Sequence, residues 1–178
     1  MIAVFLWGFA EATVFFVVPD VLLSLVALFD LRTTWRHVLL ATAGAFAGGA
    51  FLFHLSALQP GRSHAVVARV PFVREDMFAK VDQGLRNRGL FAVFLGSVSG
   101  IPYKLYAVEA PGFFKARDFL LATPPARAVR FVLVWLGSGL AAKLLRKMRH
   151  WNDRQVLRLY ATAWIAAYAL YWGRIVFQ

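Results

Sequence analysis

The feature that most constrains this chain is a long apolar block, residues 38–58, which contains no Lys, Arg, Asp or Glu. A helix rises about 1.5 Å per residue, so roughly 20 such residues cross the hydrocarbon core of a bilayer. Residues 124–142 and 156–177 form further apolar blocks of similar length, with arginines near their ends. The sequence therefore predicts an all-α integral membrane protein with about three transmembrane helices.

The composition agrees with this prediction. Hydrophobic residues make up 60% of the 178 residues and charged residues only 16%, whereas soluble domains are about 45–50% apolar and 25% charged. Lys and Arg outnumber Asp and Glu by 20 to 9. Because the positive residues lie mostly between apolar blocks, we interpret them as charges that flank membrane segments, and we expect no nucleic-acid partner.

Several kinds of site are disfavoured by residue content. The chain has no cysteine, which excludes disulfides, thiolate metal sites and cysteine nucleophiles. Its four histidines are scattered without a paired spacing, so we expect neither a metal ion nor another cofactor. No nucleophile–base pair is evident, and the chain is predicted not to be an enzyme. The N-terminus lacks a basic region and a small-residue cleavage site, so it is interpreted as mature structure.

Residues 1–29 are apolar but interrupted. The segment is longer than one perpendicular span requires, and Pro19 removes an amide donor and disfavours a helical conformation at Val18. Two half-helices that enter and leave on the same side, a re-entrant hairpin, explain both facts, and a single kinked helix is the alternative. Glu11 and Asp20 lie within this run, although an unpaired carboxylate at the bilayer centre costs about 2.5–3.5 kcal/mol.

Residues 89–113 repeat this pattern. Gly100 and Pro102 interrupt the apolar run near its middle, and Lys104 and Glu109 add charges to it. The chain thus shows twice a broken apolar segment followed by a Gly- or Pro-marked full span. That order is typical of transporters with inverted repeats, in which broken helices build a site near the membrane midplane. We therefore expect two re-entrant broken-helix hairpins in an inverted-repeat arrangement.

The remaining segments complete one membrane domain. Residues 38–58 carry Gly44 and Gly48, a small-residue face that lets another helix approach closely. Residues 59–88 are the most polar stretch and are predicted to lie at the interface as an amphipathic segment. Pro124-Pro125 is expected to begin the span 124–142. Residues 156–177 are expected to form the last span, whose aromatic residues face lipid or form an interfacial belt rather than a ligand cage (Tyr160, Trp164, Tyr168, Tyr171 and Trp172).

The free-energy cost of placing charges in the bilayer limits the surroundings that the charged residues can have. Their combined cost without partners would be on the order of 10 kcal/mol, so they must pair with one another or line a cavity. Glu11, Asp20 and Glu109 are candidates for proton exchange, since buried carboxylates change protonation with their surroundings. Lys104, Arg127 and Arg130 are candidates for binding a phosphate. For the two arginines, which share one helix face, snorkelling to the head groups is the alternative.

Two re-entrant hairpins would place Arg32, Arg36 and the basic connector 143–158 on one side of the membrane. Residues 59–88 and 115–117 would then lie on the other side. Both sides are basic, so the positive-inside rule leaves the orientation open. The predicted location is the cell membrane, multi-pass, and specifically the bacterial inner or plasma membrane. Homo-oligomerisation is left open.

The order of these motifs resembles the DedA (VTT-domain, SNARE-associated) family of membrane proteins. Glu11, Pro19 and Asp20 resemble the acid, proline and second acid of the family's first re-entrant motif. The stretch "NRGLFAVFLGSVSGIPYKLYAVEAPGFF" resembles its second motif, with Pro102 matching the proline and Lys104 as the nearest counterpart of the second arginine. Ser99 stands where the first arginine is usual.

Ile101-Pro102-Tyr103-Lys104, together with Arg127-x-x-Arg130-Phe131, is similar to the small YqaA-like subset of that family. The resemblance covers residues 11–142. It implies a transporter, flippase or scramblase for phosphate-bearing lipid, either phospholipid or a polyprenyl-phosphate carrier, with paired acids that handle protons and basic residues that hold the phosphate. Two alternatives stay open: a scaffold that transports nothing, and a membrane enzyme that modifies lipid.

Overall fold

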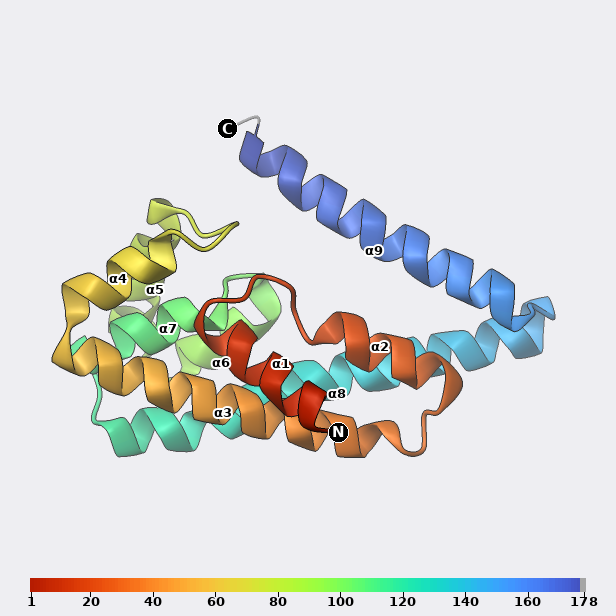
Figure 1. Cartoon of the computed structure of the whole chain (residues 1–178), viewed down its shortest axis with the longest axis horizontal. Coiled ribbons are helices and arrows are strands. Elements are labelled where there is room, and N and C mark those ends of the chain that lie inside the picture. The colour runs from red at the N-terminus through yellow and green to blue at the C-terminus, as the bar shows by residue number, and fades with distance from the viewer. Residues whose placement is uncertain (177–178) are drawn as a thin grey trace.

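The computed structural model describes residues 1–176, and within them the chain folds into nine α-helices and one 3-10 turn without a β-strand (Figure 1). This confirms the all-α fold class. The helices in chain order are α1 (Ile2–Thr13), α2 (Asp20–Phe29), α3 (Thr34–Leu58), α4 (Pro60–Ala68), α5 (Glu75–Arg88), α6 (Phe91–Ser99), α7 (Tyr103–Glu109), α8 (Ala116–Arg149) and α9 (Asp153–Val176), and the 3-10 turn η1 (Ala110–Gly112) follows α7.

The small-residue face of α3 is covered by α1. A β-carbon added at Gly44 would collide with the backbone carbonyl of Phe5, and one at Gly48 would lie 2.6 Å from the carbonyl oxygen of Phe9. On α1, Gly8 is held equally close to the backbone of Ala41. Because only glycine fits at such contacts, the two helix backbones approach each other directly, and α1 and α3 form the most extensive helix pair of the molecule.

The two long helices α3 and α8 organise the rest of the core. Helix α8 packs against α3 on one side and against α2 on another. Its buried residues include Phe119 and Phe131, which join Leu23 of α2 and Phe53 of α3 in one hydrophobic cluster. Phe53 and Phe119 stack with ring centroids 5.2 Å apart. This frame holds the shorter helices α1, α2, α6 and α7, whose ends meet in the middle of the molecule.

Both interrupted segments consist of two helices joined by a short irregular stretch. Helix α1 ends at Thr13 and α2 begins at Asp20, directly after Pro19, so residues 1–29 do not form one kinked helix. Helix α6 ends at Ser99 and is followed by Gly100, which has a left-handed conformation (φ 83°) that glycine adopts without strain, and α7 begins after Pro102. The two interruptions contact each other, because Lys104 donates a hydrogen bond to a carbonyl of the first one, that of Phe15.

One predicted boundary is wrong. Pro124 and Pro125 lie inside α8 rather than at its start, since the helix begins at Ala116. The prolines remove two amide donors, but the face formed by Phe119, Thr123 and Ala126 is fully buried, and this packing keeps the helix continuous. Residues 59–88 form two helices, α4 and α5, and their position at the membrane interface stays a prediction.

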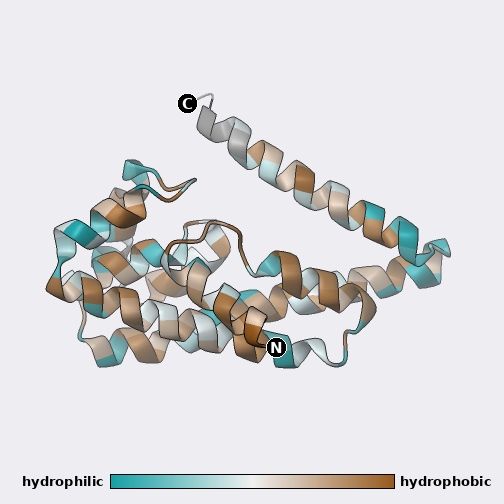
Figure 2. Ribbon diagram, in the orientation of Figure 1, coloured by the Kyte–Doolittle hydropathy of each residue, from teal (hydrophilic) through white to brown (hydrophobic). Residues whose placement is uncertain are grey.

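Helices α3 and α8 are the two described helices that are long and apolar enough to cross a membrane. Helix α9, with 24 residues, is long enough but is not one of these two, so the third predicted transmembrane helix stays a prediction. Hydrophobic residues extend along α1, α2, α3 and α8, whereas hydrophilic residues gather around α4 and α5 and at the turn between α8 and α9, at opposite ends of the long axis (Figure 2).

Candidate functional site

A buried ion pair joins the first interrupted segment to α8. Glu11, near the end of α1, accepts a hydrogen bond from Arg127 Nη2 at 2.5 Å. Both side chains are almost completely buried, with exposed fractions of 1% for Arg127 and 4% for Glu11. The guanidinium also lies over two aromatic rings, 5.1 Å from the centroid of Tyr103 and 4.8 Å from that of Phe131. Arg127 therefore points into the protein and does not snorkel.

Arg130, one turn further along α8, connects the two interruptions. Its Nε and Nη2 donate to one carboxylate oxygen of Asp20, at 2.8 and 2.5 Å. Its Nη1 donates to the carbonyl of Ser97 at 3.2 Å. Asp20 is the first residue of α2 and Ser97 belongs to the last turn of α6. One guanidinium thus holds the start of α2 and the end of α6 in place.

Lys104 is the third buried cation, with 2% of its surface exposed. Its ammonium group donates to the carbonyl of Phe15 at 3.0 Å, and its electrostatic neighbours are Glu11 and Arg127. Among the described residues no carboxylate lies within ion-pair distance of Lys104, unlike the two arginines. An ammonium has three donors, so Lys104 retains capacity for an acceptor that is not part of the chain.

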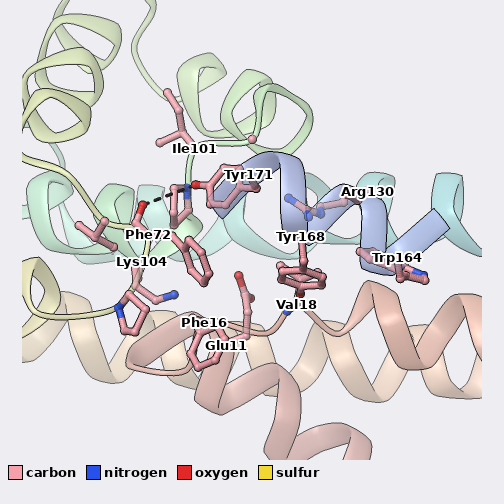
Figure 3. A pocket seen from close by; sticks show the side chains of 15 residues that line it. Glu11, Phe16, Val18, Phe72, Ile101, Lys104, Arg130, Trp164, Tyr168 and Tyr171 are labelled. Atoms are coloured by element: carbon pink, nitrogen blue, oxygen red, sulfur yellow. Dashed lines mark hydrogen bonds between the residues drawn. The ribbon is translucent and has the colours of Figure 1, made fainter. Parts of the chain in front are cut away.

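These groups border a cavity of about 200 Å³ between the two interruptions and α9. Glu11, Lys104 and Arg130 reach it, and Figure 3 shows the Glu11 carboxylate pointing into it between Lys104 and Tyr168. Gly100 and Pro102, predicted as part of a hairpin break, line it as well. Its apolar wall is largely aromatic and comes from three separate segments of the chain (Phe16, Phe72, Trp164, Tyr168 and Tyr171).

The aromatic residues of α9 were predicted to face lipid or to form a belt, and for several of them this is wrong. Trp164, Tyr168 and Tyr171 line the cavity. They share one helix face with Tyr160, whose hydroxyl donates to the carbonyl of Val21 at 2.6 Å. This face meets the start of α2, where the backbone N–H of Val18, in the interruption before the helix, donates to the Tyr168 hydroxyl at 3.4 Å. The side chain of Trp172 lies outside the described residues.

The formal charges of the site do not cancel. Three cations, Lys104, Arg127 and Arg130, face two acids, Glu11 and Asp20, which leaves one positive charge in excess. Two buried polar atoms near it, Asp20 Oδ1 and Arg127 Nε, have no hydrogen-bond partner among the described residues. Buried polar atoms are nearly always hydrogen-bonded to protein, water or a ligand. The excess positive charge suits an anion, whereas Asp20 Oδ1, which can only accept, needs a donor such as water or a hydroxyl group.

Glu109 is not part of this cluster. It lies at the end of α7, where its electrostatic neighbours are His64 of α4 and Asp82 of α5. Pro19, by contrast, stands where the sequence predicts it, immediately before Asp20. Of the six charged residues predicted to form the site, five converge on the two interruptions, and Glu109 belongs to another part of the fold.

Sequence reasoning missed the aromatic groups of the site. Tyr103 is buried beneath Arg127, and its hydroxyl is hydrogen-bonded to Thr123 Oγ1 at 2.8 Å. Its ring lies where a β-carbon at Gly49 would be. The sequence signal for this contact was Gly49, next to Gly48, because a glycine there leaves room for a large side chain from another helix.

In the part of the chain that the structure describes, His, Asp and Glu do not gather in groups of three or more that could hold a metal ion. Comparisons with protein-family models, with curated proteins and with solved structures give no match for this chain.

Proposed function

We propose that this chain is an integral membrane protein that moves lipids with a phosphate-bearing headgroup across the membrane. The observation that carries the proposal is Lys104: a buried cation without a carboxylate partner, at the edge of a cavity whose other wall is aromatic. A cation beside an apolar wall suits an amphiphile with an anionic head. Phosphate is the anion expected, because Arg130 and Lys104 offer charged donors from two sides.

The surface of the molecule supports a membrane location. Less than half of the apolar stretch of α3 or of α8 is buried inside the protein. Many large apolar side chains along these helices are exposed, among them Leu39, Phe51 and Leu133. Soluble monomers rarely expose contiguous apolar surface of this kind. With hydrophilic residues gathered at the two ends of the long axis (Figure 2), the membrane normal follows that axis in our proposal.

In this orientation the two interrupted segments become re-entrant hairpins. Helices α1 and α2 enter from the side of the α2–α3 turn, and α6 and α7 from the side of α4 and α5. Their tips meet at the midplane, where the Lys104–Phe15 hydrogen bond joins them. This is the inverted arrangement of broken helices found in many transporters, and it accords with the resemblance to the DedA family.

Transport is favoured over the two alternatives because, among the described residues, both acids of the site are paired while one cation, Lys104, is not. A scaffold needs only closed ion pairs, such as Glu11–Arg127, and has no use for the unpaired Lys104. An enzyme that modifies lipid needs a nucleophile or an activated water beside a base. Glu11 is held by Arg127 and Asp20 by Arg130, so both carboxylates are engaged as counter-ions. Their proposed further role is to accept protons when the anion displaces them from the arginines.

Reconstitution in liposomes tests this function. The full chain is placed in phosphatidylcholine vesicles that contain trace fluorescent phosphatidic acid, and lipid movement is followed by quenching from outside. We expect movement that Lys104→Ala slows about tenfold or more, because a lost charge-assisted hydrogen bond costs about 1.5–3 kcal/mol. Lys143→Ala, at an exposed position of α8, is the matched control and should transport normally.

Each failure identifies an alternative. Vesicles that contain wild-type protein but show no faster lipid movement than empty vesicles would favour the scaffold. Chemical conversion of the phosphatidic acid, measured by mass spectrometry, would favour the enzyme. Equal rates for wild type and Lys104→Ala would remove the lysine from the mechanism.

A further inference from the structure

A second hollow lies next to the first. It has a volume of about 410 Å³ and lies between α2, α8 and α9, toward the turn that joins α8 to α9. Its lining contains no charged residue. Small residues, including Gly137, Ala141 and Ala163, leave the space open, and leucines such as Leu133 and Leu159 form apolar walls.

Trp164 separates the two hollows and is the residue that lines both. Its indole Nε1 donates to Ser24 Oγ of α2 at 3.1 Å, so the polar edge of the ring is satisfied and its faces are left for apolar contact. The charged cavity therefore continues past the Trp164 ring into the second hollow, which also lies beneath α9. We refer to this uncharged second hollow as the groove.

We propose that this groove holds the hydrocarbon chain of the lipid whose phosphate lies against Lys104, so that one molecule occupies both hollows. This inference rests on the proposed function and adds where the chain lies. Charge is separated across Trp164, because the cations lie on one side of its ring and the lining on the other side is uncharged. An inorganic anion would use only the first hollow, whereas an amphiphile matches both.

Gly137 provides a way to close the groove without disturbing the fold. A β-carbon at this position meets no atom within 4 Å, so a phenylalanine side chain enters open space. Gly61 of α4 is equally open and lines neither hollow. Gly61→Phe is therefore a matched control for Gly137→Phe.

The test is photo-crosslinking of the full chain in phosphatidylcholine nanodiscs that contain phosphatidic acid with a diazirine in the middle of its chain. We expect adducts on residues 133–145 and 156–164 that unlabelled phosphatidic acid competes away. Each methylene kept out of the groove weakens binding about fourfold. Gly137→Phe should therefore reduce the competable adducts about tenfold or more, and Gly61→Phe should not.

Two further arms separate this inference from the proposed function. Lys104→Ala should reduce the same adducts, and a diazirine phosphatidylcholine should give only adducts that phosphatidic acid cannot compete. If the Lys104-dependent, competable adducts map elsewhere and Gly137→Phe changes nothing, the groove is wrong while the headgroup site stands. If Lys104→Ala leaves labelling and transport unchanged, the proposed function fails first, and this inference falls with it.

Discussion

Glu11 and Arg127 form an ion pair of 2.5 Å between residues 116 positions apart in the sequence, and both side chains are almost completely buried. Removing one partner of such a pair leaves an uncompensated buried charge, which costs about 3–5 kcal/mol. The pair thus ties α1 to α8 next to the cavity, and the site and the fold depend on the same contact.

A double-mutant cycle measures this dependence. We expect Arg127→Met to lower the stability of the detergent-solubilised protein more than the double variant Glu11→Gln, Arg127→Met, because the double variant leaves no carboxylate unpaired. Lys104 is an electrostatic neighbour of Glu11 and should soften the effect of Arg127→Met. Thermal unfolding of the four proteins gives the coupling, and strictly additive effects would show that the two residues do not interact.

Arg130 is predicted not to tolerate lysine. Lysine can form the ion pair with Asp20, but it lacks the fork that also reaches the Ser97 carbonyl. Arg130→Lys should therefore slow lipid transport more than it lowers the unfolding temperature. The matched control is Arg149→Lys, at the exposed end of α8. Snorkelling would predict the reverse, namely that both substitutions are neutral in vesicles.

The interruptions of the fold could be predicted from the sequence because they depend on local chemistry. Proline at 19 and 102 and glycine at 100 act on their own backbone, and each marks the end or start of a helix. The same local rule fails at Pro124-Pro125, where buried packing on α8 and α3 outweighs two missing amide donors.

The charges of the site could be named but not paired. The free-energy cost of burying unpaired charges requires that the acids and bases pair. Only the packing of α8, however, decides that Arg127 pairs with Glu11 and Arg130 with Asp20. Glu109 was grouped with Glu11 because both are acids within apolar segments, whereas the fold places Glu109 near His64 and Asp82. The aromatic face of α9 has a helical spacing that suits lipid and cavity equally, so its role required the structure.

The absence of cysteine from the sequence makes topology directly testable. We expect single cysteines at Thr33 and Met148 to react with a membrane-impermeant maleimide from one side of right-side-out vesicles. Cysteines at Gly61 and Arg117 should react from the other side. All four positions are exposed, so reactivity reports the side rather than burial. Labelling of all four from one side would contradict the proposed membrane crossing of α3 and α8.

Asp30, in the turn before α3, is predicted to give a pH-dependent contribution to stability. Its carboxylate accepts hydrogen bonds from the amides of Arg32 and Thr33 and from the Thr33 hydroxyl. The Thr33 hydroxyl contributes most to lowering the Asp30 pKa below its ordinary value of 3.8. A lowered pKa means that the contribution is complete above pH 3.8 and is lost as the pH falls through the folded-state value. The unfolding temperatures of wild type and Asp30→Ala should therefore differ at pH 7 and converge toward pH 3. A gap that stays constant would mean that the hydrogen bonds do not depend on the charge.

The last prediction concerns protons. Glu11 reaches the cavity, and Asp20 adjoins it through Arg130, so an anion that binds Arg130 competes with Asp20 for the same guanidinium. A carboxylate that loses its partner in a buried site becomes easier to protonate, which couples anion binding to proton uptake. Replacing either acid with its amide keeps the shape and removes the negative charge. We expect Glu11→Gln and Asp20→Asn each to abolish the acceleration of lipid movement by a pH gradient across the vesicle, while transport without a gradient persists at a lower rate.

Glu109→Gln, outside the cluster, is the control and should keep the full response. If both amide variants respond to the gradient as wild type does, the carboxylates serve only as counter-ions, and transport through this site is passive.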